Sequence, residues 1–141
     1  STTVAKQTGL PVWTSFTVDE DKGELLRSGE PILDGAKAVL AKGASAILIN
    51  CSPPESITQA VEKLVALGAE IGAIANGFVT TEPLKGNTTV DVLESRLELT
   101  PQKYVTFTKD WLSKGTKIIG GCCEIGPQHI AEINNIREAR N

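Results

Sequence analysis

A fourfold alternation of short apolar runs and longer helical stretches constrains the fold of this chain more than any other feature. The four runs are apolar on both faces and bounded by glycine or polar residues; they cover residues 10–18, 45–50, 70–76 and 117–121. Such runs are typical of strands buried in a parallel sheet. Strand and helix in regular alternation predict four βα units, so the sequence indicates an α/β fold.

Each run is followed by a segment with apolar residues at helical spacing. We expect helices over residues 31–42, 53–67 and 100–115, and a last helix that begins at residues 126–127. The second helix carries a start signal, with Ser52 as the N-cap and Glu55 three residues on, which predicts a capping box. The connection over residues 77–99 is too long for an ordinary strand-to-helix loop, and such connections are usually functional or mobile.

Four βα units fit two architectures. One is a small doubly wound sheet, and the other is half of an eight-stranded (β/α)8 barrel. A complete barrel takes about 250 residues, whereas this chain has 141. Periodicity alone does not distinguish the two, because both are built from the same units.

The composition excludes several classes of protein. Apolar residues make up 40% and charged residues 22% of the chain, which is the balance of a globular domain. A formal net charge of -3 gives no basic surface for nucleic acid or for an anionic membrane. No apolar run approaches the roughly 20 residues of a spanning helix. The chain starts at Ser1 and contains no methionine, so we expect it to be a segment of a longer gene product.

The three cysteines directly follow predicted strands. Cys51 comes after the run 45–50, and Cys122 and Cys123 come after the run 117–121. Ligand sites in parallel α/β folds form at the carboxyl ends of the strands, so all three thiols fall at that end. An odd count with two adjacent residues is not a disulfide framework, and it indicates a reducing compartment, by default the cytoplasm.

Three thiolates suit Zn²⁺ as a catalytic metal. Zinc prefers tetrahedral sulfur and nitrogen ligands, and one position stays open when the protein supplies only three. An incoming thiol in that position would lose its proton and still act as a nucleophile. Two alternatives stand beside this reading. Cysteines are often simply buried under loops, and Cys122 and Cys123 are adjacent and could form a strained vicinal disulfide.

Several stretches of the chain resemble the successive motifs of one known family. They are VWTSFTVDE, SGEPI, NCSPPES, ANG, LTPQKYVTFTKDWLSKGTKIIGG and GGCCEIGPQHI, and together they cover nearly the whole chain. The chain thus resembles the homocysteine S-methyltransferase domain. The resemblance implies a (β/α)8 TIM-type barrel, of which residues 1–141 would be the C-terminal half with strands five to eight. It also implies that Cys51, Cys122 and Cys123 bind Zn²⁺.

The resemblance further implies a reaction and its partners. Members of the family transfer a methyl group to the thiol of L-homocysteine and give methionine; the substrate sulfur is the nucleophile, so no catalytic residue is expected beyond the metal ligands. The donor would be a small molecule, which is S-methylmethionine, S-adenosylmethionine, betaine or a methylated folate in different members. The rest of the barrel would lie upstream of Ser1, since the family's first four strands have no counterpart here. A non-catalytic zinc-binding or redox-sensing thiol domain is the alternative function.

Two polar residues are candidates for substrate binding. Asn76 matches an asparagine that ends the seventh strand of the family, and Ser15 lies near the end of the first run, where it could reach the substrate. For His129, the only histidine, we expect a packed or solvated ring rather than a metal ligand. Glu124 stands where the family often has glycine, which changes the charge beside the metal without removing a ligand.

Overall fold

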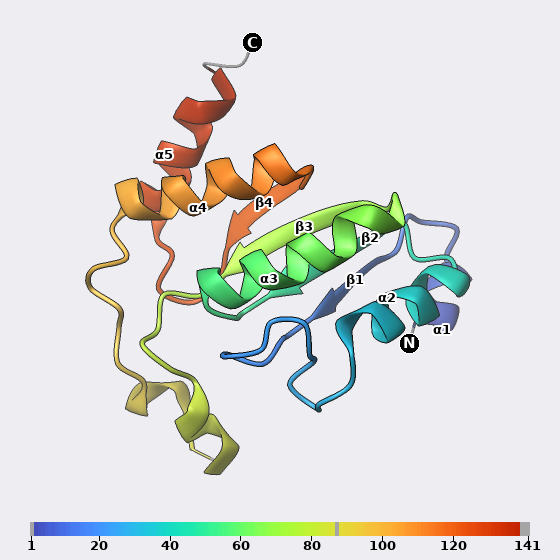
Figure 1. Cartoon of the computed structure of the whole chain (residues 1–141), viewed down its shortest axis with the longest axis horizontal. Helices are drawn as coiled ribbons and strands as arrows, with labels where there is room; N and C mark the ends of the chain where they lie inside the picture. The colour runs from blue at the N-terminus through green and yellow to red at the C-terminus, as the bar shows by residue number, and fades with distance from the viewer. Residues whose placement is uncertain (1, 87, 139–141) are drawn as a thin grey trace.

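The computed structural model describes residues 2–86 and 88–138, which form one parallel sheet with helices between its strands (Figure 1). The strands are β1 (Trp13–Phe16), β2 (Ala46–Asn50), β3 (Glu70–Ala75) and β4 (Ile118–Gly121). The α-helices are α1 (Thr2–Lys6), α2 (Ile32–Ala41), α3 (Pro54–Leu64), α4 (Pro101–Lys114) and α5 (Pro127–Glu138). Short 3-10 helices are η1 (Val65–Leu67), η2 (Glu82–Gly86) and η3 (Val90–Val92).

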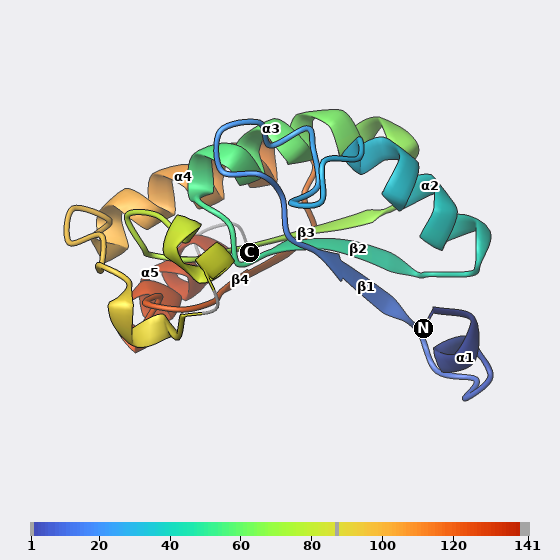
Figure 2. The same cartoon turned by 90° about the horizontal axis from the view of Figure 1, so that it is seen from below.

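The four strands lie side by side in the order in which they occur in the chain. The sheet order is β1-β2-β3-β4, and every neighbouring pair is parallel. Figure 2 shows α2, α3 and α4 on one side of this sheet, and α5 packs against α4. A doubly wound sheet would reverse its strand order and carry helices on both faces. The structure therefore has the arrangement of consecutive barrel units, and the predicted alternation of parallel strands with helices is confirmed.

The core lies between the sheet and the helices that cover it. Ile47 and Ile49 on β2 and Ile71 on β3 face these helices and are at most 1% exposed. The largest fully buried side chain, Trp111 on α4, donates its indole N–H to Thr58 Oγ1 on α3 at 2.8 Å. Burial of each large apolar side chain stabilises the fold by about 1.5–3 kcal/mol, so these contacts hold the helices on this face.

The opposite face of the sheet is more open. Trp13 is 57% exposed, Ser15 is also exposed, and Leu48 and Ile74 are only partly buried. At Gly72, opposite Leu48 in the register, a Cβ would lie 2.2 Å from Leu48 Cδ2, so the leucine side chain lies across the glycine. In a closed (β/α)8 barrel, the equivalent face is the packed interior.

The start of α3 differs from the predicted capping box. The helix begins after Pro53, and no side chain caps it. Ser52 Oγ instead accepts the N–H of Val18 at 3.1 Å, and the Glu55 carboxylate binds Arg96. Pro54 lacks one of the two N–H groups that a cap at Ser52 could bind, and both polar side chains bind other segments instead.

Strand β1 is shorter than the predicted run over residues 10–18. Its pairing starts at Trp13, opposite the first residue of β2, and ends at Phe16. Beyond Phe16 the chain leaves the sheet, because Val18 pairs with Leu26 in an antiparallel bridge instead of with β2. The segment after β1 therefore folds into a loop over the carboxyl ends of the strands.

The long connection between β3 and α4 contains η2 and η3, and α4 then begins where predicted. Thr100 is its N-cap, and its hydroxyl accepts the N–H of Lys103 at 3.3 Å. Gly115 ends the helix with a φ of 108°, a left-handed conformation that glycine adopts without strain. Among the described helices, none is both long and apolar enough to cross a membrane.

Candidate metal centre

The three cysteines converge at the carboxyl ends of β2 and β4. Their sulfur atoms all lie within 4.8 Å of one another, and the Sγ atoms of Cys122 and Cys123 are 3.7 Å apart. The sheet places them: the N–H of Cys51 donates to Ile74 O at 3.0 Å, and the N–H of Cys122 donates to Ala75 O at 2.8 Å. Strand β3, which lies between β2 and β4, therefore positions both parts of the cluster.

The spacing of the sulfurs fits one tetrahedral metal ion. Zinc–sulfur bonds of ~2.3 Å at tetrahedral angles would separate the sulfurs by roughly 3.8 Å. The observed upper limit of 4.8 Å is within about 1 Å of that value. All three cysteines are free and partly buried. In the part of the chain that the structure describes, they are the one group of three or more potential ligands with this spacing.

The electrostatics of the cluster favour neutral thiols over free thiolates. Burial, followed by the neighbouring Cys122 thiol, raises the pKa of Cys51 to about 12. Burial is also the main cause that raises the pKa of Cys123. Negative sulfurs so close together would repel each other in a medium of low dielectric. A divalent cation removes this repulsion, because thiols lose their protons when they bind a metal.

The backbone has an uncommon conformation on both sides of the cluster. Cys51 has a φ of 50° and Glu124 a φ of 65°, both in the left-handed region. This region costs non-glycine residues roughly 1–2 kcal/mol, and such strain clusters at functional sites. The glycine that the family often has in place of Glu124 would adopt this conformation freely. The carboxylate of Glu124 accepts the hydroxyl of Ser95 at 2.7 Å.

Backbone hydrogen bonds connect the two residues after β3 to both parts of the cluster. The N–H of Asn76 donates to Ser52 O at 3.1 Å, beside Cys51, and the N–H of Gly77 donates to Cys123 O at 2.8 Å. The segment after β3 thus bridges the two cysteine-bearing loops.

The two predicted substrate-binding residues lie in different environments. Asn76 is fully buried; its Oδ1 accepts the N–H of Phe78 at 3.2 Å, and its Nδ2 has no hydrogen-bond partner among the described residues. A buried donor without an acceptor is costly, and it suits a site that a ligand completes. Ser15 is exposed on the open face of the sheet, at the register position of Leu48.

His129 lies outside the cysteine cluster and is partly buried. Its Nδ1 accepts the N–H of Gly126 at 3.2 Å, so its Nε2 carries the proton and donates to Leu99 O at 2.9 Å. The ring lines a pocket of about 240 Å³ that Ser95, Arg96 and Glu124 also line. The histidine therefore connects the start of α5 to the end of the long connection.

Arg96 is a residue of this region that sequence reasoning did not identify. Its guanidinium binds the Glu55 carboxylate through two hydrogen bonds of 2.8 Å, and its Nε donates to Glu98 at 2.7 Å. The hydrogen bond from Arg96 is the largest cause that lowers the pKa of Glu55. The pair fastens the long connection to the first turn of α3. Because 41 residues separate the two partners in the chain, no local motif marks the pair.

The sequence model of one protein family matches almost the whole chain. The model of homocysteine S-methyltransferase covers residues 2–137. The chain belongs to the homocysteine S-methyltransferase family. The resemblance of its motifs to that family is confirmed.

Similar proteins include plant enzymes and a bacterial one. Homocysteine S-methyltransferase 2 of Arabidopsis thaliana is 26% identical over 132 residues, which are 89% of this chain and 36% of that protein. Selenocysteine Se-methyltransferase of Brassica oleracea var. italica is 26% identical over 132 residues, 89% of this chain and 35% of that protein. The metallated homocysteine methyltransferase MmuM of Escherichia coli has a TM-score of 0.66 at 23% identity. The alignment with that structure covers 98% of this chain and 38% of that one. The chain therefore has the fold of part of a homocysteine methyltransferase barrel, and it spans less than two fifths of these relatives.

Proposed function

We propose that this chain carries the metal site of a zinc-dependent enzyme that transfers a methyl group to the thiol of L-homocysteine and gives methionine. The observation that supports this most directly is the convergence of Cys51, Cys122 and Cys123, whose sulfurs lie within 4.8 Å of one another. Three protein thiolates leave a fourth tetrahedral position for a substrate sulfur. In this proposal, these cysteines are the metal ligands, and no further residue acts as acid, base or nucleophile.

The chemistry is a displacement at the methyl carbon. Zinc, when bound, keeps a coordinated thiol in its thiolate form near neutral pH. The homocysteine sulfur, having lost its proton, forms a bond to the methyl carbon while the bond between that carbon and the donor breaks. The electron pair of the broken bond leaves with the donor. A free thiol with a pKa near 8.5 is only a few per cent thiolate at neutral pH, so deprotonation is the step that needs help.

Asn76 and Ser15 are our candidates for binding the substrate. The unpaired Nδ2 of Asn76 is a donor for an acceptor atom of the substrate, such as a carboxylate oxygen. Its backbone N–H is tied to the residue after Cys51, which supports a place beside the metal. Ser15 is on the open face of the sheet, which faces the barrel interior in this proposal.

We further propose that residues 1–141 supply strands five to eight of the barrel and that four more βα units of a longer protein complete it. The open sheet face with Trp13, Leu48 and Ile74 supports this, since the interior of a barrel is filled by side chains from all strands. Three free cysteines also support a reducing compartment such as the cytoplasm.

Metal analysis combined with a methyl-transfer assay tests the function. In the full-length protein, we expect one zinc per chain and methionine formation from L-homocysteine with one of four donors: S-methylmethionine, S-adenosylmethionine, betaine or a methylated folate. Chelation of the zinc should abolish turnover, and readdition should restore it. Cys122→Ala should lose zinc and turnover together. If Cys122→Ala kept stoichiometric zinc and near-normal turnover, the three-thiolate site would be wrong. Zinc binding without turnover on any donor would favour a binding or redox-sensing domain.

A further inference from the structure

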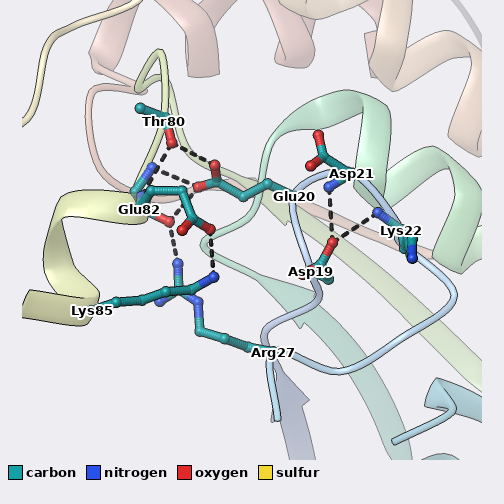
Figure 3. A network of polar contacts seen from close by, with 9 residues as sticks. Asp19, Glu20, Asp21, Lys22, Arg27, Thr80, Glu82 and Lys85 are labelled. Atoms are coloured by element: carbon teal, nitrogen blue, oxygen red, sulfur yellow. Dashed lines mark hydrogen bonds and ion pairs between the residues drawn. The ribbon is translucent and has the colours of Figure 1, made fainter. Parts of the chain in front are cut away.

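A carboxylate outside the cysteine cluster joins two of the loops above the strand ends. Glu20, in the connection after β1, accepts a hydrogen bond from Thr80 Oγ1 at 2.7 Å (Figure 3). It also accepts hydrogen bonds from the N–H of Thr81 at 2.5 Å and from the hydroxyl of Thr81. The threonines lie about 60 residues further along the chain, in the connection after β3. Three hydrogen-bond donors on one carboxylate indicate a specific contact between the two connections.

Thr81, which donates to Glu20, is buried and also binds a cationic side chain. Thr81 is 2% exposed, and its hydroxyl also accepts a hydrogen bond from Arg27. Arg27, Thr81 and Glu20 thus form a chain of charge-assisted hydrogen bonds, which are stronger than neutral ones. Burial raises the pKa of Glu20, but the hydrogen bonds from Thr80 and Thr81 outweigh it and lower the pKa overall.

The loop that carries Glu20 is bound to helix α3. The backbone carbonyl of Glu20 accepts the hydroxyl of Ser56 on α3, and the N–H of Gly23 donates to Gln59 Oε1 on the same helix at 2.8 Å. A Cβ at Gly23 would lie 2.0 Å from Ser56 O, so the loop lies directly against the helix. Helix α3 packs in the core, so its contacts with this loop fix the position of the Glu20 backbone.

The threonine side leads within a few residues to the metal centre. Gly77, whose N–H binds Cys123 O, lies three residues before Thr80, and Asn76 precedes it. Between these points, the Phe78 side chain is buried and that of Val79 is exposed, but the N–H of Val79 donates to Glu94 O at 2.9 Å. The carbonyl of Gly77 accepts the N–H of Arg96 at 2.7 Å, so the backbone of this segment is held on both sides of Phe78. A shift of Thr81 would therefore be transmitted to the backbone that carries Asn76.

We propose that Glu20 is a positioning residue for the cysteine site: its carboxylate holds the start of the connection after β3 and thereby fixes Asn76 and Gly77 beside Cys123. This inference rests on the proposed function insofar as Asn76 binds the substrate. Glu20 touches no reacting atom. Its loss should weaken substrate binding more than it slows the displacement.

The experiment compares Glu20→Ala, Glu20→Gln and Glu24→Ala in the full-length, zinc-loaded protein. Glu24 is an exposed carboxylate of the same loop and serves as the matched control. Glutamine keeps an acceptor oxygen for Thr81, whereas alanine keeps none. Amide hydrogen exchange is measured over residues 77–86, and kcat and KM for L-homocysteine are measured with the donor that the wild-type protein uses.

For Glu20→Ala, we expect exchange at Thr81 and at Gly77 to be at least about tenfold faster and KM for homocysteine to rise about tenfold, with kcat within about twofold. Zinc content should stay unchanged. Glu20→Gln should recover most of both losses, and Glu24→Ala should match the wild type. Unchanged exchange and KM in Glu20→Ala would overturn the inference, as would loss of zinc together with global unfolding. A wild-type protein without methyl transfer would refute the proposed function instead, and the exchange arm would still decide the role of Glu20.

Discussion

The carboxyl ends of the strands and the open face of the sheet differ in how many of their contacts come from within this chain. At the strand ends, the loops bind one another through Glu20, Asn76, Gly77 and Arg96, and the three cysteines converge without help from any other segment. On the open face, Trp13 remains 57% exposed. The comparison teaches that the cysteine cluster forms within this chain, whereas the open face of the sheet stays incompletely packed. In the proposed half barrel, this chain holds the three candidate metal ligands and only part of the packing.

The largest expected effect of a substitution is on zinc binding, and it tests whether the strand ends of this chain alone form the metal site. In Cys51→Ser, we expect the zinc affinity to fall at least about a hundredfold, because a neutral hydroxyl replaces one of three thiolates. The fall should be the same in residues 1–141 alone and in the longer protein, since all three proposed ligands lie in this chain. Competition with a chromophoric chelator measures both affinities.

His129→Gln is the matched control for the zinc measurement. The ring of His129 binds Gly126 and Leu99 and lies outside the cluster, so zinc affinity should stay within about threefold of the wild type. A loss of zinc in His129→Gln that equals the loss in Cys51→Ser would require the histidine in the ligand set. A difference between the short and long proteins would mean that a segment outside residues 1–141 supplies a ligand.

A change on the open face should show the opposite dependence on chain length. In the longer protein, Leu48→Ala should lower the free energy of unfolding by about 2–4 kcal/mol, because it leaves a cavity in a packed interior. In residues 1–141 alone, the loss should be about 1 kcal/mol, since Leu48 is only partly buried there. Urea unfolding of both proteins measures the difference. Equal losses would show that this face is not the barrel interior.

The smallest expected effect is the pH dependence of stability that two carboxylates near the strand ends contribute. The folded-state pKa values of Glu20 and Glu55 lie below the ordinary value of 4.5, for Glu55 chiefly because of the hydrogen bond from Arg96. The unfolded chain therefore binds more protons in acid. The stability from these groups is present above pH 4.5 and is lost as the pH falls through their folded pKa values. Both groups are partly exposed, so each contributes under about 1 kcal/mol.

Unfolding free energies between about pH 3 and 6 check this dependence. Glu55→Gln should flatten the acid limb, whereas Leu48→Ala should lower stability equally at every pH because it removes no titratable group. An acid limb that is unchanged in Glu55→Gln would exclude the Arg96 pair as a source of stability.

The sequence predicts the framework of this molecule better than its loops. The strand ends that carry Cys51 and Cys122 could be placed because parallel strands bring their carboxyl ends to one edge, wherever they lie in the chain. The cap predicted at Ser52 was wrong, because a distant N–H, that of Val18, competes for its hydroxyl. The contacts of Glu20 join two connections, and the contact of Arg96 with Glu55 joins a connection to a helix. Both depend on how segments far apart in the chain meet, which the spacing of apolar residues does not predict.

The separation of Cys51 from the other two cysteines has a consequence for how the protein is made. They are 71 residues apart in the chain, and a ribosome adds roughly 5–20 residues per second. Roughly 4–14 seconds therefore pass between the addition of Cys51 to the growing chain and the addition of Cys122. The proposed metal site forms only when the βα unit that carries Cys122 and Cys123 has been made, so zinc capture would report that synthesis has passed β4.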